Sequence, residues 1–143
     1  MAVPENILEV RDLVVKYGST VVLKDISFDV QRGENFVILG GSGCGKSTLL
    51  RNLVGLMRPS SGVIRYNGQD FTAMTDDERV VVRRKMGMCF QGSALFGSMT
   101  VAENVALPLR EHTGLDDSII GIMADIKLNL VGLAHRANHL PAQ

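Results

Sequence analysis

Apolar positions that partly alternate with polar ones mark two predicted strands near the N-terminus. Residues 7–15 and 21–30 are rich in Val, Ile and Phe, and this pattern is typical of strands with one buried face. Tyr17, Gly18 and Ser19 lie between the two segments and predict a turn. We therefore expect an antiparallel β hairpin, placed at the edge of the fold.

Two shorter runs have the continuous apolar pattern of strands that are buried on both faces. Residues 36–39 read FVIL and residues 86–90 read MGMCF, and such runs are typical of a parallel sheet. Residues 63–66 form another strand candidate, which Asn67 and Gly68 end with the sequence of a tight hairpin turn. The chain is thus expected to be an α/β protein, with the first hairpin beside a partial parallel core sheet.

The remaining periodic segments are predicted to be helices. Residues 47–56 place leucines at helical spacing. Two capping-box patterns, in which a threonine precedes a glutamate by three positions, predict helix starts at Thr75 and Thr100. The helix that follows Thr100 should be disturbed or stopped by Pro108. Further helical patterns cover roughly 76–84 and 116–131.

A glycine-rich run lies between the strand candidate at 36–39 and the helix candidate at 47–56. It reads GGSGCGKST and matches the pattern G-x-x-x-x-G-K-[ST]. Glycines leave no Cβ between the backbone and a phosphate, and the next helix directs its free N–H groups at the same anion. We therefore predict a site for the phosphates of a nucleoside triphosphate. Its residues are Gly40, Gly41, Ser42, Gly43, Cys44, Gly45, Lys46, Ser47 and Thr48.

Individual side chains of this run are predicted to add specific chemistry. Lys46 would bring a mobile positive charge to the β- and γ-phosphates, and the Ser47 hydroxyl would ligate Mg²⁺. Thr48 would contribute its N–H or hydroxyl on the α-phosphate side. Cys44 is interpreted as a small loop residue, because no histidine base lies nearby in the sequence. The alternative is a glycine-rich turn that happens to precede a lysine; the strand and helix on either side favour the phosphate site.

Composition narrows the class of protein. The chain has 143 residues, enough for one domain, and equal numbers of acidic and basic residues; this balance argues against a broad nucleic-acid surface. Cys44 and Cys89 form neither a disulfide framework nor a spaced metal site, which indicates a reducing compartment. Neither a transmembrane run nor a secretory signal pattern is present. We expect a cytoplasmic location, unless a partner holds the chain at a membrane.

The order of these motifs resembles the N-terminal part of an ATP-binding-cassette (ABC) ATPase. The resemblance rests on Tyr17 ahead of VLKDISFDVQRGE, on the glycine run followed by LLRNLVGLMRPSSGVIRYNGQD, and on Phe90-Gln91 at the end of a strand candidate. It implies an incomplete P-loop NTPase domain, with a nucleotide-binding core at 1–91 and the start of a helical subdomain at 92–143. It also implies that Tyr17 stacks on adenine and that Gln91 contacts Mg²⁺ or the attacking water. A half-buried hairpin tyrosine and a polar strand-end residue are the alternatives.

A narrower resemblance is to the ATPase subunit of Mla/Mce-type transporters, which move phospholipid between bacterial membranes. It rests on the sequences GSALF at 92–96 and ENVA at 103–106. It implies a membrane permease as partner, contacted through Leu95, Phe96 and Met99, a second ATPase subunit in a homodimer, and a place on the inner membrane through the permease. Burial of these side chains in the helical subdomain is the alternative. A soluble ABC protein without a permease, or a nucleotide-binding module only, is the alternative for the whole chain.

Several motifs that the ABC resemblance implies are missing from the sequence. It contains no LSGG signature, no later apolar strand that ends in Asp-Glu, and no switch histidine, since His112, His135 and His139 precede the expected place. We therefore expect no catalytic residue: the chain should bind Mg-ATP and hydrolyse it poorly or not at all. We expect a fragment or truncated gene product, the alternative being a shorter but complete domain. The open edge of a buried-type strand predicts marginal solubility.

Overall fold

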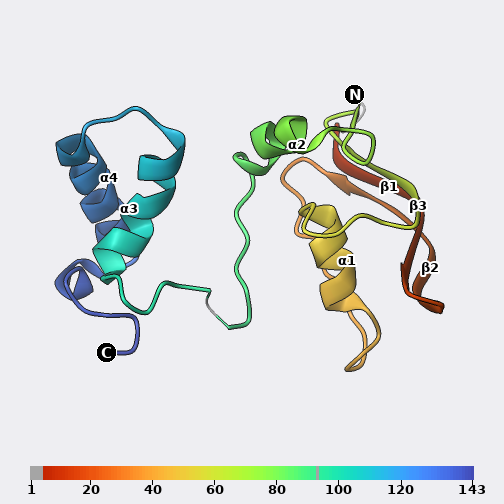
Figure 1. Cartoon of the computed structure of the whole chain (residues 1–143), viewed down its shortest axis with the longest axis horizontal. Helices are drawn as coiled ribbons and strands as arrows, with labels where there is room; N and C mark the ends of the chain where they lie inside the picture. Colours follow the sequence, from red (N-terminus) through yellow and green to blue (C-terminus); the bar gives the residue numbers. More distant parts are fainter. Residues whose placement is uncertain (1–4, 93) are drawn as a thin grey trace. The chain divides into compact units, whose positions relative to one another are not determined.

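The protein consists of two compact units in the computed structural model, which describes residues 5–92 and 94–143 (Figure 1). The first unit ends at Met88, and the second comprises Cys89–Gln143. Ser93, which belongs to the motif at 92–96, lies outside the described residues, as do residues 1–4.

An antiparallel sheet with the strand order β2-β1-β3-β4 forms one layer of the first unit (Figure 1). The predicted hairpin is confirmed, with Tyr17 opposite Thr20 at its turn. The predicted turn at Asn67 and Gly68 is also confirmed, because both residues have positive φ (47° and 76°), as a tight hairpin turn requires. The strands are β1 (Asn6–Tyr17), β2 (Thr20–Gln31), β3 (Ser61–Tyr66) and β4 (Gln69–Asp70).

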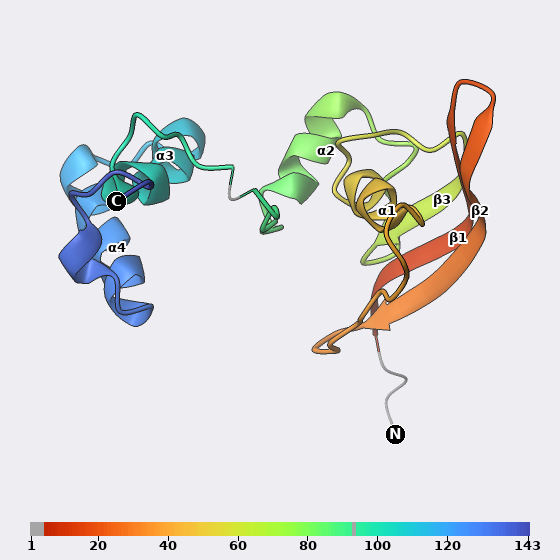
Figure 2. The same ribbon diagram turned by 90° about the horizontal axis from the view of Figure 1, so that it is seen from below.

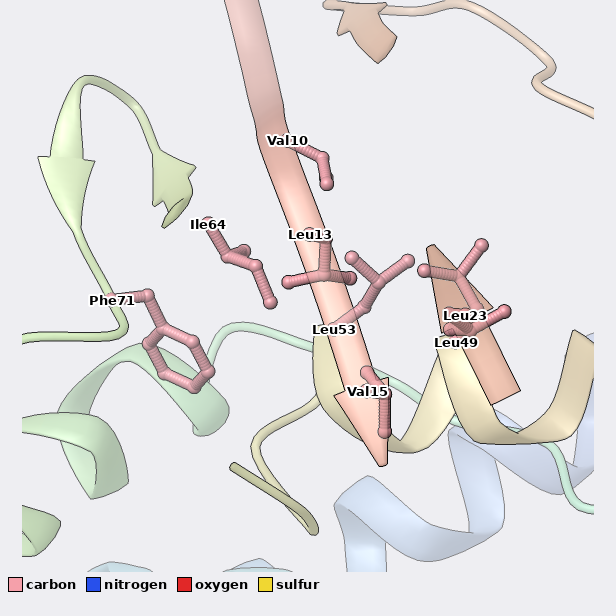
Figure 3. Close-up of a cluster of buried hydrophobic side chains, with 8 residues drawn as sticks. All are labelled: Val10, Leu13, Val15, Leu23, Leu49, Leu53, Ile64 and Phe71. Carbon is pink, nitrogen blue, oxygen red and sulfur yellow. The ribbon is translucent and has the colours of Figure 1, made fainter. Parts of the chain in front are cut away.

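Helix α1 (Lys46–Leu53) packs against one face of this sheet and closes the apolar core (Figure 2). Strict alternation along β1 would place Val10 and Leu13 on opposite faces. A register irregularity between them, with Asp12 at φ 48°, brings both side chains to the buried face. Figure 3 shows the eight buried side chains of this core. They are Val10, Leu13, Val15, Leu23, Leu49, Leu53, Ile64 and Phe71.

Helix α1 ends three residues earlier than its leucine pattern predicts. Gly55 follows the helix with φ 72°, and a Cβ there would lie 2.6 Å from Cζ of Phe71. This close approach turns the chain after the helix. Of the leucines at 49, 50, 53 and 56, Leu49 and Leu53 are buried in the core. The other two, Leu50 and Leu56, are exposed.

Both predicted capping boxes are formed. Thr75 precedes α2 (Asp76–Arg83) and accepts a hydrogen bond from the N–H of Glu78, whose carboxylate accepts the N–H of Thr75 at 2.8 Å. Thr100 and Glu103 repeat this arrangement at the start of α3 (Val101–His112), with a distance of 2.7 Å from the Thr100 nitrogen to the Glu103 carboxylate. The backbone N–H that each carboxylate accepts lowers the pKa of both glutamates.

In the second unit, α3 packs against α4 (Asp117–Leu130) through Ala106, Ile120 and Ala124. The expectation that Pro108 stops α3 is wrong, since the helix runs on to His112. A proline removes only its own N–H donor, and the packing on α4 holds the turns on both sides. A short 3₁₀ helix, η1 (Ala134–Arg136), follows α4. No helix of the described residues is long and apolar enough to cross a membrane.

Neither continuous apolar run forms a strand within residues 5–92 and 94–143. No neighbouring strand pairs with 36–39 or with 86–90, and Leu39 is 87% exposed. A strand is held by hydrogen bonds to a neighbour, so a buried-type run without that neighbour stays irregular. The partial parallel core sheet that these runs predict is therefore not formed by the described residues.

Candidate phosphate-binding site

The glycine run forms a loop that leads directly into the N-terminus of α1. Gly45 is the N-cap of the helix with φ 98° and ψ 5°, and its carbonyl accepts the N–H of Leu49 at 2.8 Å. The N–H groups of Lys46, Ser47 and Thr48 belong to the first turn, where an α-helix offers them no acceptor. No acidic side chain lies in this turn. Free N–H groups and the positive end of the helix dipole therefore meet at this point, as an anion site requires.

Close packing against β2 holds the end of the loop. A Cβ at Gly45 would lie 2.7 Å from Cδ2 of Leu23 and 3.4 Å from Cγ1 of Val22. Leu23 is buried in the core and pairs with Val15 of β1. Glycine is thus needed at Gly45 both for its positive φ and for its contact with the hairpin.

The ammonium group of Lys46 folds back into the loop. Its Nζ donates to the carbonyl oxygens of Gly40 at 2.7 Å and of Gly41 at 2.6 Å, and lies 3.6 Å from Sγ of Cys44. A Cβ at Gly40 would overlap the same sulfur atom. The loop therefore closes tightly around the lysine, and its own backbone carbonyls hold the ammonium charge.

The hydroxyl groups of Ser47 and Thr48 follow the lysine on the first turn of α1. Within the part of the chain that the structure describes, neither hydroxyl has a hydrogen-bond partner, so Ser47 Oγ can serve as an oxygen ligand for a hard cation. No group of three or more His, Cys, Asp or Glu side chains suited to a metal ion exists among the described residues.

Tyr17 lies at the same end of the hairpin as the loop. Leu23, which packs against Gly45, pairs with Val15 of β1. Tyr17 follows Val15 by two residues, a distance of about 7 Å along a strand. Its hydroxyl lies 3.4 Å from Sδ of Met57, and its surface is 47% exposed. The Tyr17 side chain is thus held at its hydroxyl by the methionine, and about half of its surface remains exposed.

Gln91, the remaining predicted site residue, belongs to the second unit. The glycine loop belongs to the first unit, and the role of Gln91 at Mg²⁺ stays a prediction. Of the three side chains predicted to meet a partner, Leu95 and Phe96 are 52% and 58% exposed, and Met99 is partly buried.

Sequence reasoning missed the residues that support the site. Leu23 braces Gly45, and Met57 holds the Tyr17 hydroxyl. These contacts join positions 22 and 40 residues apart along the chain. No local sequence pattern predicts these contacts. An apolar residue in a strand or a loop has the same sequence context whether or not it contacts the glycine loop or Tyr17.

The fold of the first unit and its loop define a P-loop nucleotide-binding protein. Residues 23–142 match the protein family described as ABC transporter. The chain therefore belongs to the ABC transporter family, as its sequence motifs predict.

Particular relatives narrow the comparison. The chain is 38% identical over 139 residues to the intermembrane phospholipid transport system ATP-binding protein MlaF of Haemophilus influenzae. The matched region covers 97% of this chain and 53% of that protein. It is 40% identical over 136 residues to a Mycobacterium leprae protein named "Probable ribonucleotide transport ATP-binding protein mkl", covering 95% of this chain and 39% of that one. The resemblance to Mla/Mce-type ATPases is thereby confirmed.

Solved structures show the same fold. A dimeric ATP-binding cassette in a post-hydrolysis state, bound to ADP and Pi, has a TM-score of 0.85 and 30% identity to this chain, covering 95% of it and 62% of the cassette. This likeness confirms the predicted class, a partial P-loop NTPase domain of the ABC type. The chain spans about half the length of the curated relative MlaF that it matches.

Proposed function

We propose that this chain is the nucleotide-binding part of the ATP-binding subunit of an ABC transporter, and that the transporter moves phospholipid between membranes. One observation carries the nucleotide site: the glycine loop that holds the Lys46 ammonium leads directly into α1, whose first N–H groups have no acceptor within the helix. The cargo class is supported by the identity to MlaF, whose name describes intermembrane phospholipid transport.

Each residue of the site has a role toward Mg-ATP in this proposal. Lys46 binds the β- and γ-phosphates, the backbone of residues 40–45 surrounds them, and Thr48 binds on the α-phosphate side. Ser47 and Gln91 hold Mg²⁺, which neutralises phosphate charge when it is bound. Tyr17, which is 47% exposed, stacks on adenine, and aromatic stacking of this kind adds about 0.5–1.5 kcal/mol beyond the burial of area.

Hydrolysis belongs to the full-length protein in this proposal. Phosphoryl transfer requires an oriented water and groups that stabilise charge at the transferred phosphate. The sequence of this chain has neither an LSGG segment nor the later apolar strand ending in Asp-Glu that the family resemblance implies. A second ATPase subunit would supply the signature across a homodimer, and the chain by itself would bind ATP without turning it over.

The remaining parts of the proposal concern the partner. The residues at 1–91 form the nucleotide-binding core, and those at 92–143 begin a helical subdomain that meets a membrane permease. Exposed Leu95 and Phe96 support this contact, and the permease would hold the protein at the inner membrane. The name of the Mycobacterium leprae relative refers to ribonucleotide transport, so a nucleotide cargo is the second candidate.

Photo-crosslinking tests the transporter assignment. A photoreactive amino acid at Phe96, in the full reading frame expressed in its native cells, is expected to crosslink to an integral membrane protein. Ile122 is the matched control, because it belongs to the same unit and is 61% exposed. Crosslinks from Phe96 to soluble proteins only, or equal crosslinking from Ile122, would contradict a permease-bound motor and favour a soluble ABC protein.

A further inference from the structure

The loop that leads into α3 is exposed and apolar, yet its backbone is held in one place. Leu95 and Phe96 expose more than half of their surface, and Ala94 has a positive φ of 52°. An exposed loop of this kind has few apolar contacts to restrain it. Its conformation must therefore come from hydrogen bonds, and one side chain provides most of them.

The carboxamide of Asn104 pairs with both backbone groups of Phe96. The Phe96 N–H donates to Oδ1 at 2.8 Å, and Nδ2 donates to the Phe96 carbonyl at 3.1 Å. This is the pairing that a neighbouring strand gives to a residue at the edge of a sheet. Asn104 thus satisfies, from the first turns of α3, two polar groups of a loop residue that no strand adjoins.

The same side chain also ties the other end of the loop. Nδ2 lies 3.1 Å from the Met99 carbonyl oxygen and 2.9 Å from that of Thr100. An amide nitrogen has two hydrogens, so these carbonyls share them with Phe96. The N–H of Met99 closes the turn onto the Phe96 carbonyl at 3.1 Å. One carboxamide therefore fixes the start and the end of the segment 96–100.

The helix that carries Asn104 is itself well anchored. The first N–H groups of α3, those of Val101 and Ala102, donate to the carbonyls of His139 and Ala137, both at 2.9 Å. Its inner face packs on α4 through Ala106. Loss of the Asn104 contacts would therefore release the loop while the helix pair stays in place.

We propose that Asn104 is the positioning residue of the partner-binding loop: it fixes the backbone at 96–100 so that Leu95 and Phe96 are presented to the membrane permease. The inference rests on the proposed function, because it takes the permease as the partner. Leu95 also lines an apolar groove of about 470 Å³ between α3 and α4, so the direction of this side chain depends on the same hydrogen bonds.

Two substitutions and a matched control test the proposal. Asn104→Ala removes all four contacts, and Asn104→Asp keeps the acceptor for the Phe96 N–H but loses the Nδ2 donors. Asn129→Ala is the control, because its Nδ2 makes one comparable bond, to the Asp125 carbonyl at 2.9 Å, in the same unit. The readouts are hydrogen exchange at the Phe96 amide of the 143-residue chain and crosslinking yield from position 96 in the full reading frame.

In Asn104→Ala we expect Phe96 exchange to rise at least about tenfold, since the hydrogen bond of the Phe96 N–H and the other contacts that restrain the loop are lost. Exchange within α4 should be unchanged, which shows that the unit still folds. Crosslinking to the permease should fall at least about fivefold in both Asn104 variants and stay constant in Asn129→Ala. The Phe96 amide should remain protected in Asn104→Asp.

Two outcomes overturn the inference without touching the proposed function. Unchanged Phe96 exchange in Asn104→Ala would show that Asn104 does not hold the loop. Faster exchange with undiminished crosslinking would show that loop order does not matter for the partner. Absence of any crosslink from Phe96 in the parent protein would instead refute the permease contact itself, and with it the positioning role.

Discussion

Replacing Lys46 with alanine is expected to weaken the binding of Mg-ATP by about 100-fold or more. The Nζ atom lies within 2.7 Å of two loop carbonyls, so its charge sits at the centre of the loop. A hydrogen bond to a charged group contributes about 1.5–3 kcal/mol, and the lysine is proposed to reach two phosphates. The loss therefore corresponds to about two to four decades in Kd, measured by calorimetric titration of the purified chain.

Lys24→Ala serves as the matched control for this experiment. Lys24 is an exposed lysine of β2 in the same unit, so its removal changes the net charge equally without touching the loop. Its affinity for Mg-ATP is expected to stay within about threefold of the parent. A Lys46→Ala variant that binds as tightly as the parent, or a Lys24→Ala variant that loses as much affinity, would show that Lys46 does not bind the phosphates.

Replacing Gly45 with alanine is expected to damage both the fold and the site. The left-handed backbone at φ 98° disfavours an L residue by about 1–2 kcal/mol. The new Cβ would also press on Leu23 at 2.7 Å, and overpacking of a core costs about 1–3 kcal/mol. We expect a loss of about 2–5 kcal/mol in the free energy of unfolding, read as a fall in melting temperature of about 8 °C or more.

The comparison variant is Gly87→Ala. Gly87 has no positive φ, and a Cβ there would meet nothing within 4 Å, so its melting temperature should change by less than about 3 °C. The Gly45→Ala protein should also lose affinity for Mg-ATP at temperatures where it is still folded, because the first N–H groups of α1 shift. Retention of both melting temperature and affinity in Gly45→Ala would contradict the close packing of the loop on the hairpin.

Features that depend on neighbouring residues were predictable from the sequence. The turn at Asn67 and Gly68 requires residues that tolerate positive φ, and the caps at Thr75 and Thr100 require a glutamate three positions later. The glycine loop belongs to the same class, because its chemistry is contained in nine consecutive residues. In each case the residues that determine the structure lie within nine consecutive positions of the sequence.

Features that depend on distant partners were not predictable. The runs at 36–39 and 86–90 have the composition of central strands, but no strand pairs with them in the described residues. The end of α1 is set by Phe71, which packs onto Gly55 from beyond β4. Pro108 remains inside α3, where helix packing outweighs one missing donor.

The central claim is that the loop before α1 recognises phosphates, and a nucleotide series tests it most directly. The 143-residue chain would be titrated with ATP, ADP and AMP in the presence of Mg²⁺. Because AMP carries one phosphate and cannot engage Lys46 and the start of α1 together, it should bind at least about 100-fold more weakly than ATP. ADP keeps the β-phosphate but lacks the γ-phosphate that Lys46 is proposed to reach, so its affinity should lie between those of AMP and ATP. Equal binding of AMP and ATP, or no binding of ATP at millimolar concentration, would contradict the claim.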